Sequence, residues 1–421
     1  MIPLALSGYM HFFKIAGISS ALIFQLLFLI GYFKKSINYF YYSKVLSVLL
    51  SFYIILNLYQ STVSEFSFFS SLLLFMRRIL PILLISVLPV LIKSGLNIAV
   101  SGQFNKQVYI QGFFIFSALL SFVLPCQSWY GGICFLSLSM PSHISFVSLT
   151  ALIVLIYSFF NFKERFDSYK RYNFSKFILL YLSHLNIYIY IFLGVQSGTR
   201  SFVFSFLAIL LIFLLFKIFN LIKNLKLDIS IFNFSKSSFY FYSFITALLV
   251  FLINKINIKV IIDKIPEGIL NRVLPSLFNP SKTLFNDERI QNWDFYSIFE
   301  SDNLNTLLFG KGIGSKLGDW NGISIYDSFY NLIIVDYGIA GALVTLSILI
   351  ITLINIMKII EKKKLFESNI KKEKQINYDL KKRTIFLLFI AIFILSIVNE
   401  VLFLNGGANI FISAALLISI L

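Results

Sequence analysis

One arginine stands where an apolar segment begins. In "VQSGTRSFVFSFLAILLIFLLFK" (195–217), Arg200 precedes a run of apolar residues typical of a membrane helix. A helix N-terminus carries partial positive charge, so a cation there costs about 0.3–1 kcal/mol unless an anion shares the site. Ser197 and Thr199 add hydroxyl groups, and the backbone N–H groups of a helix N-terminus bind phosphate. These residue types predict an anion site; the alternative is an arginine that extends to phospholipid phosphates.

Two further arginines lie in a long polar segment. Arg289, in "NDERIQNW", is four residues before Trp293. A guanidinium binds phosphate oxygens in a bidentate manner, and an aromatic ring beside carboxylates and amides offers a face for a sugar. The alternative for Arg289 is a surface ion pair with the adjacent acidic residues 287–288. Arg272, in "PEGILNRVLP", is a weaker candidate of the same kind.

Charged residues also interrupt or border apolar stretches, where they are costly and often functional. Arg77 and Arg78, in "LLLFMRRILPIL", either face a polar cavity or mark a shifted boundary of the span. Asp327, Asp336 and Glu400 stand in "IYDSFYNL", "VDYGIAG" and "VNEVLF". Each of these three can serve as a general base or as the structural partner of one of the arginines.

The glycines of "FGKGIGSKLG" (309–318) superficially resemble a phosphate-binding loop. The stretch lacks the strand–loop–helix context of that motif, so a turn-rich loop that needs positive φ is the favoured interpretation. The three histidines are scattered, and no carboxylate cluster has the spacing of metal ligands. We therefore expect neither a metal nor a cofactor.

The composition predicts an all-α integral membrane protein. Of 421 residues, 58% are hydrophobic and 13% are charged, which a water-soluble domain cannot bury. Eleven apolar runs are long enough to be membrane helices, or twelve if a short span lies within residues 1–14. They lie near 15–33, 44–62, 70–92, 108–125, 143–162, 177–195, 201–216, 238–254, 329–357, 384–401 and 405–421.

The net charge of +17 is distributed unevenly between the loops. Lysines and arginines gather in alternate loops, which predicts that these loops face the cytoplasm. Residues 358–383 form the most basic of them. Residues 255–328 form one large loop on the outer face, with balanced charge and several aromatic residues. Membrane lipid, and not nucleic acid, is the partner that this pattern implies. The whole chain, 1–421, is predicted to be one polytopic domain.

Together these segments resemble the family of bacterial O-antigen polymerases and O-antigen ligases. The resemblance rests on "SGTRS", then a long outer loop with Arg289 and Trp293, then "LLFGKGIG" and "YDSFYNLIIVDYGIAG" in that order. The outer stretch "WYGGICFLSLSMPSH" (129–143) also resembles a loop of that family. The likeness covers roughly residues 120–345 as a pattern and the whole chain as a topology.

The resemblance implies a GT-C-like glycosyltransferase in the bacterial inner membrane. Its substrate would be an oligosaccharide linked through pyrophosphate to undecaprenol, and a chain-length regulator protein is a further partner to consider. In members of the family, arginines of two outer loops are thought to bind the pyrophosphate, and these arginines correspond to Arg200 and Arg289 here. Asp327 is the third catalytic candidate. The implied substrate-binding residues are Ser197, Thr199, Arg272, Trp293, Gly310, Gly312 and Tyr330.

Two other functions fit parts of the pattern. Ligases of the family carry a histidine followed by Ser or Asn where this chain has Tyr326, Asp327 and Ser328, which favours a polymerase. A transporter or flippase of lipid-linked sugars would use the charges at 77–78, Asp336 and Glu400 as a pathway through the membrane. The large polar loop and the lack of a visible internal repeat argue against that class.

Overall fold

The structure is a computed structural model, and eleven segments of the chain are described. They are residues 14–15, 18–63, 68–98, 103–123, 141–167, 174–196, 202–212, 303–312, 329–367, 372–398 and 407–421. The predicted span near 238–254 and most of the predicted large loop lie outside these residues.

Helices make up nearly all of the described chain. A short hairpin of β1 (Lys14–Ile15) and β2 (Ile18–Ser19) precedes them. The helices are α2 (Ser20–Gly31), α3 (Phe33–Tyr42), α4 (Lys44–Val63), α5 (Phe68–Ile98), α6 (Gln103–Val123), α7 (Pro141–Asp167), α8 (Phe174–Gln196), an unlabelled helix Phe202–Ile212, α16 (Leu304–Phe309), α17 (Phe329–Glu367), α18 (Lys372–Val398) and α19 (Gly407–Ile420).

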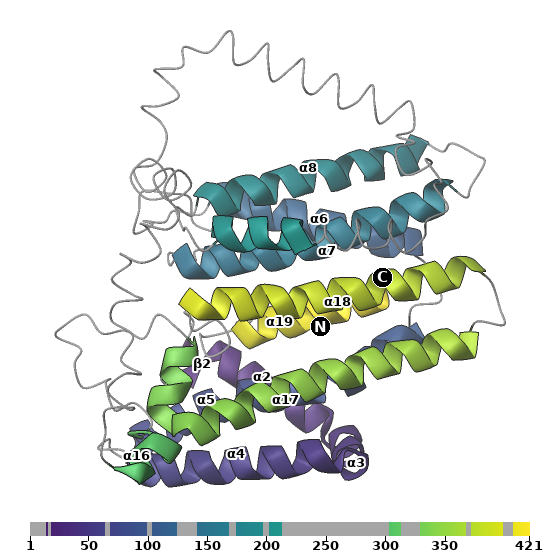
Figure 1. The fold of residues 1–421 in the computed structure, drawn as a ribbon. Helices are drawn as coiled ribbons and strands as arrows, with labels where there is room; N and C mark the ends of the chain where they lie inside the picture. The colour runs from purple at the N-terminus through teal and green to yellow at the C-terminus, as the bar shows by residue number, and fades with distance from the viewer. Residues whose placement is uncertain are drawn as a thin grey trace, which may run out of the picture.

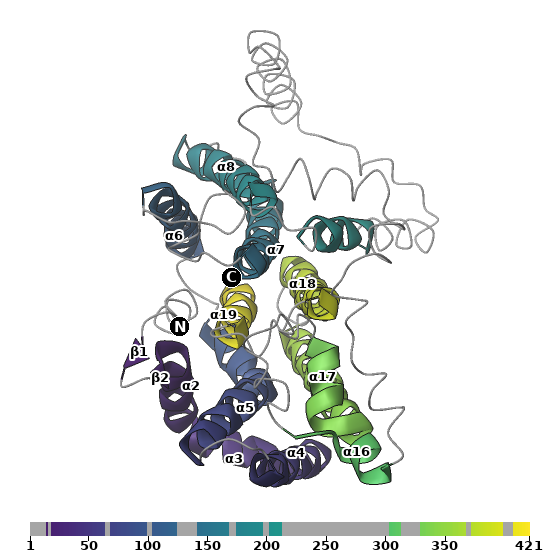
Figure 2. The same ribbon diagram turned by 90° about the vertical axis from the view of Figure 1, so that its left-hand side faces the viewer.

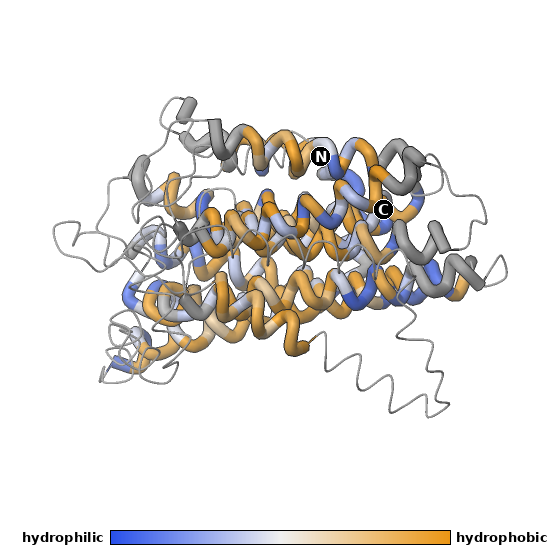
Figure 3. The backbone as a smooth tube through the Cα atoms, turned by 90° about the horizontal axis from the view of Figure 1, so that it is seen from above, coloured by the Kyte–Doolittle hydropathy of each residue, from blue (hydrophilic) through white to orange (hydrophobic). Residues whose placement is uncertain are grey.

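The long helices lie side by side in one bundle (Figure 1). Seen along the helices, α6, α7 and α8 form one group, and α4, α5 and α17 form another, with α18 and α19 between them (Figure 2). Hydrophobic residues run along most of each helix (Figure 3), as expected for a bundle that lipid surrounds.

Side-chain contacts give the directions of the helices. Arg78, near the start of α5, pairs with Asp336, near the start of α17. At the far ends of the same two helices, Lys363 of α17 donates a hydrogen bond to Asn97 of α5, with a length of 3.2 Å. The helices α5 and α17 therefore run in the same direction. The short helix α16 lies at the end of the bundle where both begin (Figure 1).

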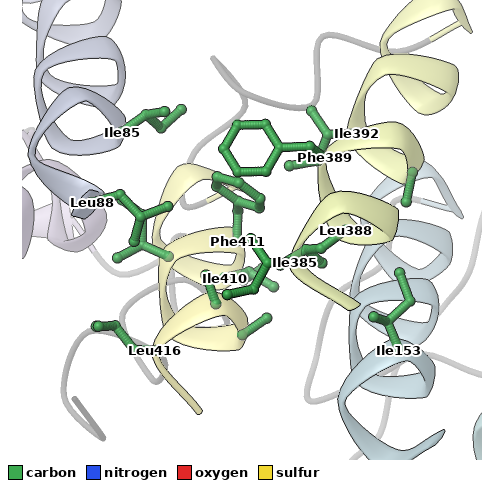
Figure 4. Close-up of a cluster of buried hydrophobic side chains, with 14 of the residues drawn as sticks. Ile85, Leu88, Ile153, Ile385, Leu388, Phe389, Ile392, Ile410, Phe411 and Leu416 are labelled. Atoms are coloured by element: carbon green, nitrogen blue, oxygen red, sulfur yellow. The ribbon is translucent and has the colours of Figure 1, made fainter. Parts of the chain in front are cut away.

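The core lies where α5, α7, α18 and α19 meet (Figure 4). Phe389 of α18 meets Phe411 of α19 edge to face, with ring centroids 5.0 Å apart. Around this pair pack aliphatic side chains that include Ile85, Leu88, Ile153, Ile385, Leu388 and Leu416. Small residues let the backbones approach: Gly95 of α5 lies directly against Ser419 of α19, a device common in membrane helix packing.

Five described helices are long and apolar enough to cross a membrane. They are Lys44–Thr62, Ser71–Asn97, Ile144–Asn161, Ile178–Val195 and Leu332–Phe366. Each agrees within about ten residues with a span predicted from the sequence. The chain is thus a helical protein with membrane-spanning segments. Shorter apolar helices lie within four more predicted spans, at Leu22–Gly31, Gln107–Leu119, Phe202–Ile212 and Gly407–Ile420.

The first predicted span, 15–33, differs from the structure. Strand pairing occupies Lys14–Ile15 and Ile18–Ser19, so the helix begins only at Ser20. Twelve residues of helix extend about 18 Å, which is less than the hydrocarbon core of about 30 Å. Beyond a junction at Tyr32, the chain continues as α3, which carries two exposed lysines, Lys34 and Lys35.

The basic segment predicted as a loop at 358–383 is largely helical. The helix α17 extends to Glu367, and α18 begins at Lys372. Two ion pairs join these helix ends: Lys364 with Asp379 at 2.9 Å, and Lys382 with Glu361 at 2.7 Å. Lysine and glutamate are good helix formers, which explains why the helices extend beyond their apolar parts.

Candidate functional site

The described part of the predicted large loop, residues 303–312, lies against the first turns of α17. Its helix α16 begins with an N-cap, since the Asn303 side chain accepts a hydrogen bond from the backbone N–H of Asn305 at 3.0 Å. The helix ends at Gly310, where φ is 84°. A positive φ of this kind favours glycine, so "FGKG" ends the helix and turns the chain toward α17.

The helix α17 is broken at Gly338, where φ is 66° and ψ is −167°. A break leaves the carbonyl groups of the preceding turn without their usual donors four residues on. The backbone N–H of Lys311 donates to one of these carbonyls, that of Val335, at 2.8 Å. The segment 310–312 thus supplies a hydrogen-bond donor to the last turn of the short helical piece 329–337.

The two glycine stretches touch through their backbones. A Cβ atom added at Gly310 would lie 2.5 Å from the carbonyl carbon of Asp336. A Cβ atom added at Gly338 would lie 2.4 Å from the carbonyl carbon of Leu308. "LLFGKGIG" and "VDYGIAG", distant in the sequence, therefore meet at a contact that only glycine accommodates.

A buried ion pair lies beside this contact. The Arg78 guanidinium Nη2 is 3.2 Å from Asp336 Oδ2, and the two side chains are 5% and 1% exposed. The sequence left Asp336 either as a general base or as the structural partner of an arginine, and the structure shows it as the ion-pair partner of Arg78. Both Arg77 and Arg78 lie inside the continuous helix α5, within its apolar span, so they do not mark a boundary of that span.

Polar side chains of α4 extend the buried site. The Tyr337 hydroxyl donates to Asn57 Oδ1 at 2.6 Å, and Asn57 Nδ2 donates to the carbonyl of Tyr53 at 2.8 Å. The Tyr53 hydroxyl donates in turn to the carbonyl of Arg78 at 3.3 Å. One turn farther along α4, Gln60 Nε2 donates to the carbonyl of Phe309 in α16. The side chains of Tyr53, Asn57, Gln60 and Tyr337 that make these hydrogen bonds are all buried.

Sequence reasoning missed the contribution of α4. Tyr53, Asn57 and Gln60 recur at intervals of four and three residues, which places them on one face of a helix. Two amide side chains on one face of an apolar span were the signal that could have identified them, because polar groups in a membrane helix face protein partners.

Three of the predicted site residues lie in the described chain. Gly310 and Gly312 both have positive φ, of 84° and 102°, which confirms the prediction of turns. Tyr330 lies about two turns before the break, and its hydroxyl donates to the carbonyl of Phe393 in α18 at 3.2 Å. That hydroxyl is therefore engaged in joining α17 to α18.

The other predicted site residues lie outside the described residues. They are Ser197, Thr199, Arg200, Arg272, Arg289, Trp293 and Asp327, and Glu400 is likewise outside. The helices on either side of "SGTRS" are described: α8 ends at Gln196, and the next helix begins at Phe202. The Phe202 ring lies against Gly194 of α8, so the two helix ends are in direct contact.

The described site can hold charge and polar groups in fixed positions within an apolar bundle. Its cation and its carboxylate are engaged with each other, and its glycines bring a loop segment against a broken helix. No protein-family model matches the chain, and comparisons with curated proteins and with solved structures gave no match.

Proposed function

We propose that this chain is a membrane glycosyltransferase that polymerises lipid-linked oligosaccharide repeat units into O-antigen or a similar surface polysaccharide. The site of action would be the outer face of a bacterial inner membrane. In this proposal the substrate is an oligosaccharide linked through pyrophosphate to undecaprenol, and no metal or cofactor takes part.

The observation that carries the proposal is the contact between Gly310 and Gly338. The resemblance to O-antigen polymerases depends on "LLFGKGIG" and "YDSFYNLIIVDYGIAG", which are separate motifs in the sequence. In the folded chain these motifs form one unit at the end of the helical bundle. Motifs that belong to one functional site are expected to meet in this way, which supports the proposal.

The proposed chemistry uses the leaving group that the substrate already has. A hydroxyl of the acceptor sugar attacks the anomeric carbon of the donor glycan, and the bond from that carbon to the lipid diphosphate breaks. Negative charge develops on the departing diphosphate, where Arg200 and Arg289 would stabilise it. The acceptor proton would pass to a carboxylate, for which Asp327 is the candidate.

The sequence at 326–328 favours polymerase over ligase. Ligases of the family have a histidine followed by Ser or Asn at that position, and this chain has Tyr326, Asp327 and Ser328. A transporter remains the alternative of a different class. The buried pairing of Arg78 with Asp336 gives these two charges a partner within the bundle, and a structural role of this kind does not require a transport pathway.

Deletion of the gene tests the proposal. Assembly of repeat units and their ligation would remain intact, so we expect lipopolysaccharide that carries a single repeat unit. A normal ladder of long chains in the deletion strain would overturn the proposal. Loss of even the single repeat unit would identify a ligase or a flippase instead.

A further inference from the structure

Three consecutive residues of α17 hold three different parts of the protein. The carbonyl of Val335 accepts a hydrogen bond from Lys311 in the loop segment, at 2.8 Å. The carboxylate of Asp336 pairs with Arg78 of α5. The hydroxyl of Tyr337 donates to Asn57 of α4. The turn just before the break in α17 is therefore fixed from three directions.

The ion pair acts on the same turn that receives the loop segment. Gly310 lies against the backbone of Asp336 and Tyr337, so a small rotation of this turn would move the surface on which the loop segment rests. Asp336 is 1% exposed and Arg78 is 4% exposed, which makes their geometry insensitive to solvent. A guanidinium near the C-terminal end of the helical piece 329–337 is also favoured by the helix dipole.

The loop segment has a second attachment, on α4. Gln60 donates to the carbonyl of Phe309, and the Tyr59 and Phe309 rings meet edge to face with centroids 6.4 Å apart. Asn57, on the same helix face, connects α4 to Tyr337. The helices α4 and α17 thus hold the loop segment between them, and α5 holds α17 in place through Arg78.

We propose that Arg78 and Asp336 are positioning residues, whose ion pair fixes the break in α17 and so seats residues 303–312 of the large loop on the bundle. The segment 303–312 belongs to the loop that carries Arg272, Arg289 and Trp293. In the proposed function these three residues bind the substrate, so the seating of residues 303–312 would bear on substrate binding. This last step rests on the proposed function, whereas the seating itself does not.

Cross-linking measures the seating directly. In a background with Cys126→Ser and Cys134→Ser, the pair Tyr59→Cys and Phe309→Cys would be joined by a short thiol-specific cross-linker. We expect efficient cross-linking with Arg78 and Asp336 intact. With Asp336→Asn, Arg78 keeps an uncompensated buried charge, and we expect the yield to fall on the order of tenfold. Arg78→Lys keeps the charge and should retain most of the yield.

The matched control is Asp379→Asn, which breaks the ion pair with Lys364 at the opposite end of α17. It should leave the yield unchanged. Asp336→Asn can prevent folding, because it leaves the buried charge of Arg78 without its partner. The double variant Arg78→Gln with Asp336→Asn removes both charges and is measured as well. Size-exclusion profiles in detergent show which variants are folded.

Each outcome decides the matter. A folded Asp336→Asn protein, or a folded double variant, that cross-links as efficiently as the parent would overturn the proposal. So would failure of both to give a monodisperse peak, because the pair would then support the whole bundle and not the loop seat. The two proposals can also fail separately. If the folded variants cross-link less but deletion of the gene leaves a normal glycan ladder, the seating is upheld and the proposed function is rejected.

Discussion

Gly310 and Gly338 lie back to back, so that neither position has room for a side chain. A Cβ atom at either glycine would lie within 2.6 Å of backbone atoms of the other segment. Two stretches of chain that are far apart in the sequence, a loop segment and a membrane helix, are in contact here through their backbones. The contact requires glycine on both sides.

We therefore expect Gly310→Ala and Gly338→Ala each to destabilise the protein. Both positions combine a positive φ with a backbone clash, and strain of this kind costs on the order of 1–3 kcal/mol. Thermal unfolding in detergent would measure the effect. Gly112→Ala in α6 is the control, because nothing lies within 4 Å of the added methyl group and alanine favours a helix. Equal melting temperatures for all three variants would contradict the expectation.

The hydrogen bond between Tyr337 and Asn57 gives a second expectation. Tyr337→Phe removes the hydroxyl and leaves Asn57 Oδ1 without this 2.6 Å donor. Loss of one partner of a buried hydrogen bond costs about 1–3 kcal/mol, so the variant should unfold at a lower temperature. Tyr188→Phe, at a position 45% exposed, is the control. A larger loss of stability at 188 than at 337 would be inconsistent with the buried network.

The diphosphate assignment predicts that Arg200→Ala and Arg289→Ala abolish chain extension in cells. Loss of a charge-assisted hydrogen bond of about 1.5–3 kcal/mol in the transition state slows a reaction on the order of 10- to 100-fold. Arg→Lys at either position should retain only part of the activity, since the ammonium group is a point charge and cannot reproduce the planar, bidentate hydrogen bonding of a guanidinium. The length of the glycan ladder, at matched expression, is the measurement.

Lys264→Ala and Lys316→Ala are the controls, because each removes one positive charge from the predicted large loop, which also carries Arg289. A normal ladder in both arginine variants would refute the assignment. If the lysine controls lose chain extension as completely as the arginine variants, only the overall positive charge matters and not the particular arginines.

The predicted topology can be tested by cysteine labelling. With a membrane-impermeant reagent, Ser281→Cys in the large loop should react in cells whose inner membrane is intact. Ser368→Cys, in the basic segment between α17 and α18, should react only after that membrane is opened. The opposite pattern would reverse the orientation of the chain.

The sequence alone predicted the features that composition determines. Apolar runs of sufficient length identified the five long apolar helices, because the thickness of the hydrocarbon core sets the minimum length of a membrane helix. The stretch 309–318 was predicted as a turn-rich loop from its glycines, and positive φ at Gly310 and Gly312 agrees with that prediction, because a positive φ is a local property of the residue.

The sequence could not predict which of its distant residues meet. The sequence analysis named five arginines as possible partners of Asp336, and only the packing of α5 against α17 selected Arg78. The break at Gly338 and its contact with Gly310 also depend on tertiary packing, because a glycine within an apolar run is compatible with a continuous helix. Tyr53, Asn57 and Gln60 became recognisable as a group only once their partners were known.

The pairing of Arg78 with Asp336 has a consequence for the order in which the protein is made. The two residues are 258 positions apart, which at a synthesis rate of about 5–20 residues per second is a delay of roughly 10–50 s. During that time α5 stands in or beside the bilayer with a charge whose partner does not yet exist, at a cost of about 2.5–3.5 kcal/mol. The packing of α5 against α17 that pairs these two residues can therefore form only after α17 has been synthesised.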